Sequence, residues 1–67
     1  MKSKMKLKIS EDDEDVAYLI LPDHPGEGVF GVVKKQIRLH DLLEYAGPEI
    51  YFDFDESGNL IGAEILA

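Results

Sequence analysis

The sequence predicts a small α+β fold, in which a mainly antiparallel sheet of four to five strands carries one short helix. Three observations favour it: a C-terminal β-hairpin, apolar runs with the period of strands before it, and one helix-like stretch. Residues 1–67 form a single domain. A domain of this size buries only about 60% of the surface of its unfolded chain, so we expect a marginal core in a meander-like sheet.

The C-terminal hairpin covers residues 49–67, where the turn dipeptide Ser57-Gly58 separates two alternating runs. The apolar pattern favours a loop with an even number of residues, because a one-residue slip would turn a whole row of side chains to the other face. A loop of two residues and a loop of four residues give the same register, so both lengths stay open. The resulting apolar pairs are Phe54 with Ile61, Phe52 with Ala63, and Ile50 with Ile65.

Three further strands are expected before the hairpin. In residues 4–9 apolar side chains alternate with lysines, residues 16–21 are apolar throughout, and residues 29–38 are apolar at one end and charged at the other. The acidic run 11–15 and the breaker-rich segment 23–28 are typical of loops between them.

Residues 40–48 carry the one helix signal, with Asp41 as a plausible N-cap, Gly47 at the C-terminal end and Pro48 as a stop. The helix would have at most two turns, so it needs to dock on the sheet to be stable. The face that it covers stays open. The side chains expected to dock are Leu42, Leu43 and Tyr45.

Composition restricts the class of protein. The net charge of −7 argues against nucleic-acid binding by this domain alone, since such domains are usually basic. The absence of cysteine excludes disulfides and thiolate-bound zinc. No apolar run is long enough to span a bilayer, and acidic residues follow the N-terminal lysines where a signal peptide would be apolar. We therefore expect a soluble, cytoplasmic protein with no membrane partner and no cofactor.

An apolar area outside the inferred core is the candidate interaction surface. Exposed apolar patches are normally covered by another molecule, and small domains without disulfides or metal commonly rely on a partner chain. The sequence thus predicts a homodimer or a complex with a small protein partner. The residues of this surface are Val16, Tyr18, Ile20, Phe30 and Val32.

Residues 53–64 are close to the pattern of an EF-hand calcium loop, with acids at positions 1, 3 and 12 and glycine at position 6. That site requires oxygens which converge from a loop between two helices, whereas these flanks alternate like strands. Asp53, Asp55 and Glu64 instead share one face of the hairpin, and they remain weak candidates for binding a divalent cation. Cation binding is the alternative function.

The residues form no recognisable catalytic arrangement. His24 lies in a loop beside Asp23, and His40 begins the helix-like stretch, but no serine lies in a nucleophile-elbow context. The glycines lack the spacings of phosphate-binding and dinucleotide-binding loops. We expect a protein that is not an enzyme.

Two blocks, DEDVAYLIL and IYFDFDESGNLIGAEIL, carry a family resemblance. They resemble the domain of unknown function 2283, or YuzE-like, family of small prokaryotic proteins. The chain departs from that pattern at Val16-Ala17 and in the stretch HDLLEY. The resemblance implies a small antiparallel sheet with a helix, and the proximity of such genes to small toxin-like proteins implies an antitoxin-like role. The matching positions are Asp15, Tyr18, Asp53, Asp55, Gly58, Gly62, Glu64, Ile65 and Leu66.

Overall fold

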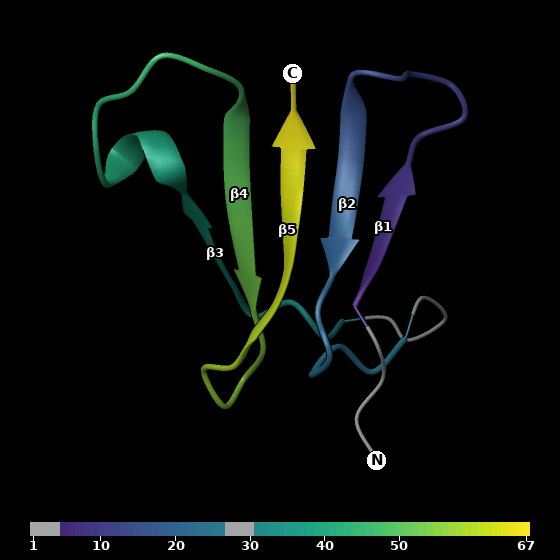
Figure 1. Cartoon of the computed structure of the whole chain (residues 1–67). Coiled ribbons are helices and arrows are strands. Elements are labelled where there is room, and N and C mark those ends of the chain that lie inside the picture. Colours follow the sequence, from purple (N-terminus) through teal and green to yellow (C-terminus); the bar gives the residue numbers. More distant parts are fainter. Residues whose placement is uncertain (1–4, 27–30) are drawn as a thin grey trace.

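A computed structural model describes residues 5–26 and 31–67, which form one five-stranded antiparallel sheet (Figure 1). The strand order across the sheet is β1-β2-β5-β4-β3. The expected antiparallel sheet is therefore confirmed. The strands are β1 (Lys6–Ile9), β2 (Val16–Ile20), β3 (Lys35–Arg38), β4 (Glu49–Phe54) and β5 (Leu60–Leu66).

The sheet is only partly a meander. Strands β3, β4 and β5 follow one another as neighbours, whereas β2 pairs with the other side of β5 and β1 lies outside β2. The acidic segment 11–15 closes the β1–β2 hairpin, where Ser10 N donates to Val16 O at 2.8 Å and Val16 N donates to Asp13 O at 3.1 Å. This segment was expected to be a loop, and the structure confirms it.

The register of the C-terminal hairpin is confirmed over most of its length. Ile50 pairs with Ile65 and Phe52 with Ala63, but Phe54 faces Leu60 where we expected Ile61. The different partner of Phe54 results from the shape of the turn.

A three-residue loop closes the hairpin: Asp55 N donates to Asn59 O at 3.0 Å, and Gly58 N donates to Asp55 O at 3.1 Å. Gly58 has a φ of +87°, the left-handed conformation that ends such a loop. One extra residue in β5, Ile61, then forms a bulge that returns the strands to the expected register. Ile61 is fully buried.

The expected helix over 40–48 is wrong in extent. The structure has a single 3-10 turn, η1 (Leu39–Asp41), so the fold is mostly β. Asp41 lies within η1 and does not cap it, and the preceding Arg38 is extended with no capping side chain. None of the helices in the described part of the chain is long and apolar enough to cross a membrane.

Aromatic contacts give the segment after η1 an irregular path. The Tyr45 ring stacks on His40 with centroids 4.0 Å apart and planes 4° apart, and its hydroxyl donates to Pro48 O at 2.8 Å. The expected docking of Leu42 and Leu43 does not occur, since they are 63% and 51% exposed.

The expected strand over 29–38 is shorter in its described part, because within residues 31–38 only Lys35–Arg38 pairs as a strand. One further bond, from Lys34 N to Phe54 O at 2.9 Å, extends the pairing. Gly31 has a φ of +71°, which breaks the extended path before this point. Phe30 lies outside the described residues.

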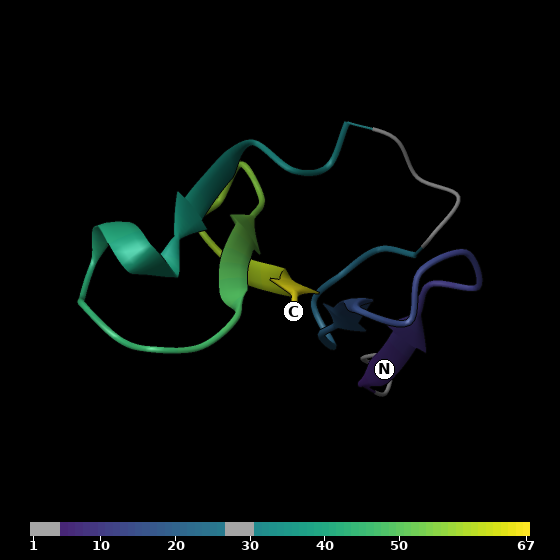
Figure 2. The same ribbon diagram turned by 90° about the horizontal axis from the view of Figure 1, so that it is seen from above.

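The sheet is a single twisted layer when seen from above (Figure 2). Among the described residues, only Ile20, Ile61 and Ala63 are buried apolar side chains. Within the described ranges there is no second sheet, and the one helical element is the short η1, which contacts β4. The strands therefore build only half of a usual hydrophobic core.

Candidate functional site

One face of the sheet is apolar from edge to edge. Directly opposed residues on neighbouring strands share a face, so the registers assemble two rows that cross the sheet. We call these nine residues the apolar face. One row contains Leu7, Leu19, Ala63, Phe52 and Ile37, and the other contains Ile9, Ala17, Ile65 and Ile50.

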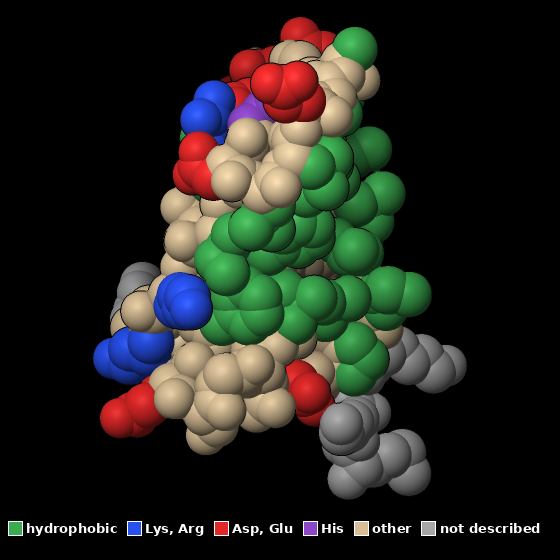
Figure 3. All heavy atoms as spheres, turned by 90° about the vertical axis from the view of Figure 1, so that its left-hand side faces the viewer, with side chains coloured by type: hydrophobic (Ala, Val, Ile, Leu, Met, Phe, Trp, Pro, Cys, Tyr) green, Lys and Arg blue, Asp and Glu red, His purple; other side chains and the backbone are tan. Residues whose placement is uncertain are grey.

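The apolar face is uncovered where β1 forms the edge of the sheet. Leu7 is 60% exposed and Ile9 58% exposed, whereas Ala63 in the middle of its row is buried. Figure 3 shows hydrophobic side chains gathered along one side of the molecule. Among the described strand residues, Lys35 is the only charged side chain whose position alternates onto this face.

The opposite face, the polar face, carries the other charged side chains of the described strands. One row contains Lys8, Tyr18, Glu64, Tyr51 and Arg38, and the next contains Lys6, Ile20, Gly62, Asp53 and Gln36.

Asp53 is the buried charged residue of the polar face, with an exposed fraction of 5%. Its Oδ2 accepts from the Tyr18 hydroxyl at 2.9 Å, and its Oδ1 accepts from Gln36 Nε2 at 2.8 Å. Gly62 lies between Tyr18 and Asp53, and a Cβ there would lie 2.5 Å from Tyr18 Cζ. Burial, together with the bond to Asp53, raises the pKa of Tyr18, so its hydroxyl stays protonated and donates.

A second polar cluster surrounds Glu49 at the start of β4. Its Oε1 accepts from Arg38 Nε at 2.7 Å and Nη2 at 2.6 Å, and lies 2.9 Å from His40 Nδ1. The Tyr51 hydroxyl donates to Oε2 at 3.2 Å. The bonds from Arg38 and then His40 lower the pKa of Glu49, so the carboxylate is held ionised. This cluster ties η1 to the start of β4.

The three candidate cation ligands have separate roles. Asp53 is held by its two donors as described, and Asp55 accepts from Ser57 N at 3.0 Å and Asn59 N at 2.9 Å. Bonds from Asn59 and then Ser57 lower the pKa of Asp55. Across residues 5–26 and 31–67, no group of three histidine, cysteine or acidic side chains, Glu64 included, is placed to hold a metal ion.

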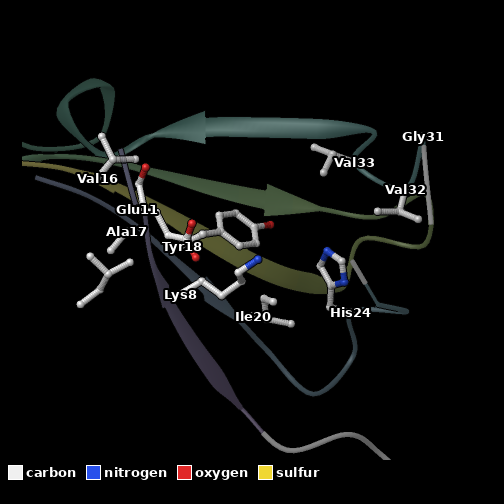
Figure 4. Close-up of a pocket in the computed structure, with 12 residues that line it drawn as sticks. Lys8, Glu11, Val16, Ala17, Tyr18, Ile20, His24, Gly31, Val32 and Val33 are labelled. Carbon is white, nitrogen blue, oxygen red and sulfur yellow. The ribbon is translucent and has the colours of Figure 1, made fainter. Parts of the chain in front are cut away.

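The expected interaction surface lies on the polar face and beside it. Tyr18 and Ile20 border a hollow of about 740 Å³, with Val32 and Val33 on its far side (Figure 4). Ile20 is only 6% exposed, so little of it remains for a partner to contact. Contact of a partner with these residues stays a prediction. The apolar face is exposed at Leu7 and Ile9. The signal in the sequence that could have shown it is that the one helix-like stretch is too short to cover a sheet.

Comparison with protein families gives a match over residues 11–67 to the family described as Protein of unknown function (DUF2283). The chain belongs to the DUF2283 family. The match confirms the resemblance inferred from the two sequence blocks. Comparisons with curated proteins and with solved structures gave no match.

The DUF2283 resemblance rests on residues with structural roles in this chain. Tyr18 and Asp53 form a partly buried hydrogen bond, and Gly62 makes room for it. The Asp55 carboxylate and the left-handed Gly58 shape the hairpin turn. These residues are thus explained by the fold itself.

Proposed function

We propose that this protein is a non-enzymatic interaction module that docks another protein surface on its apolar face. The observation that carries the proposal is the pair of apolar rows, one across all five strands and the other across four, whose β1 side chains Leu7 and Ile9 are exposed. Burial of such side chains away from water contributes about 25 cal/mol per Å², so their exposure is costly unless a partner covers them.

The polar face supports a non-enzymatic role. Tyr18, Asp53 and Gln36 hold one another, and Glu49 is held by Arg38 and its neighbours. A catalytic site needs groups free to bind substrate and to exchange protons. These side chains instead contribute to the stability of the sheet.

Two kinds of partner fit the proposal: a second copy of the chain, or a small toxin-like protein encoded beside it, as the family resemblance implies. Both would bury the same apolar rows. Cation binding through Asp53, Asp55 and Glu64 is less well supported, because two of these carboxylates already accept hydrogen bonds within the sheet and its turn.

The test compares two lysine substitutions at exposed apolar positions. Ile9→Lys places a charge on the apolar face. Ile9 and Val33 both line the hollow, so Val33→Lys is the control for any effect of a charge in the hollow itself. Self-association is measured by sedimentation equilibrium, and binding to the product of the adjacent gene by co-purification after co-expression. We expect Ile9→Lys to weaken at least one interaction by tenfold or more and Val33→Lys to preserve it. If Ile9→Lys alters neither interaction, the proposed function is wrong.

A further inference from the structure

We propose that a second copy of this chain covers the apolar face, so that two identical sheets form a two-layer β-sandwich. This inference rests on the proposed function and names its partner. The accessible surface of the chain is 5062 Å². A compact monomer of this mass would expose about 4,200 Å². The excess of about 860 Å² is close to the share of about 800 Å² that one partner contributes to an interface of standard size.

The chemistry of the face favours an identical partner. All nine side chains are apolar, so none can donate or accept a hydrogen bond that would select a polar surface. The occupant must therefore be a similarly broad apolar surface, and the same face of another copy has that size and character. A two-fold axis through the contact would bring each face against its own equivalent.

The distribution of charge permits this contact despite a net charge of −7 on each copy. Glu49, Asp53 and Glu64 lie on the polar face and would point away from the partner. Lys35 is at the start of the edge strand β3, so it would lie at the rim of the contact. Face-to-face packing thus buries no charge in the centre, where an unpaired charge would be costly.

The shape of the two rows also suits sheet-on-sheet packing. Packed sheets lie about 10 Å apart, and their side chains interdigitate. Ala63 lies between Leu19 and Phe52 in one row, and Ala17 lies between Ile9 and Ile65 in the other. These small residues leave space between larger neighbours into which side chains of the facing sheet can insert.

The first experiment measures mass by light scattering after gel filtration of the purified chain. We expect twice the chain mass of 7.5 kDa at concentrations of tens of micromolar or more. Ile9→Lys should raise the dissociation constant at least tenfold, whereas Val33→Lys should leave it within twofold. Circular dichroism checks that both variants keep the sheet, and Leu7→Lys replaces Ile9→Lys should the latter fail to fold.

The second experiment locates the contact in the unmodified protein. Isotope-filtered NOEs are recorded on a mixture of labelled and unlabelled chains. Intermolecular NOEs from the methyl groups of Leu7, Leu19 and Ile65 are expected. NOEs from Tyr18 and Val16 in their place would overturn the inference, as would a monomeric mass at all concentrations. If the protein is a monomer but Ile9→Lys abolishes co-purification with the product of the adjacent gene, the inference fails and the proposed function stands. If the protein is a monomer and Ile9→Lys does not affect that co-purification, both the inference and the proposed function are wrong.

Discussion

The hydroxyl of Tyr18 passes over Gly62 and donates a hydrogen bond to Asp53, a residue 35 positions further along the chain. The bond joins β2 to β4 across the intervening strand β5. Because Asp53 is the buried acid of the polar face, the stability of the central strands depends on its donors.

Tyr18→Phe should lower the free energy of unfolding by about 1–3 kcal/mol, because it leaves a buried carboxylate oxygen without its donor. Urea denaturation followed by circular dichroism measures the change. The matched control is Tyr51→Phe, whose longer bond of 3.2 Å reaches a half-exposed carboxylate. Tyr51→Phe should lower the free energy of unfolding by clearly less than Tyr18→Phe does. An equal loss for the two variants would contradict this account.

Gly62→Ala should destabilise the fold by about 1–3 kcal/mol, the usual cost of overpacking. The new methyl group would overlap the Tyr18 ring, which would then have to leave Asp53. The same substitution in a Tyr18→Val background should cost much less, because the shorter side chain does not reach across β5. A double-mutant cycle, measured by urea denaturation, gives the coupling free energy between positions 18 and 62. A coupling free energy near zero would rule out the steric explanation.

Gly58→Ala should cost about 1–2 kcal/mol, because a residue with a Cβ is disfavoured in the left-handed conformation. Gly58 has a φ of +87° at the end of the hairpin loop. Its exposed neighbour provides the control, since Ser57→Ala should change stability by no more than about 0.5 kcal/mol. Thermal and urea denaturation measure both, and comparable losses would show that the loop conformation is not the cause.

Acid should remove the contribution of Glu49 to stability. Its pKa in the folded protein lies below the ordinary value of 4.5, chiefly because of the bond from Arg38. The contribution is therefore complete above pH 4.5 and is lost as the pH falls through the lowered pKa. The difference in unfolding free energy between wild type and Glu49→Gln should be constant near neutral pH and shrink below pH 4.5. Urea denaturation from pH 7 to pH 2, at one protein concentration, tests this, and a difference that persists to pH 2 would refute it.

Much of the sheet could be predicted because the side chains of a strand alternate between two faces. The pairs Ile50–Ile65 and Phe52–Ala63 follow from that alternation alone. The bulge at Ile61 could not be predicted, since it depends on whether Gly58 adopts a positive φ. The helix failed for a related reason: cap residues indicate where a helix can start and end, but they do not show that Tyr45 will stack on His40 instead.

The site was predicted in part. Strand alternation places Gly62 opposite Asp53, where the missing side chain lets another group approach closely, and that group is Tyr18. The acids of the hairpin were expected on an outer surface, whereas Asp53 is buried. Sequence periodicity identifies the apolar rows but says nothing about what lies above them. In the structure η1 has only three residues, so it is too short to cover these rows.

The position of β5 has a consequence for how the chain folds. β1 pairs only with β2 and β3 pairs only with β4, so β5 supplies all the backbone pairing between the two halves, and the Tyr18–Asp53 bond can form only across it. An isolated pair of strands is at best marginally stable in water. Neither half is therefore expected to be stable before β5, the last strand in the sequence, is in place. We expect the sheet to form in one cooperative step, with no populated intermediate that contains only one half.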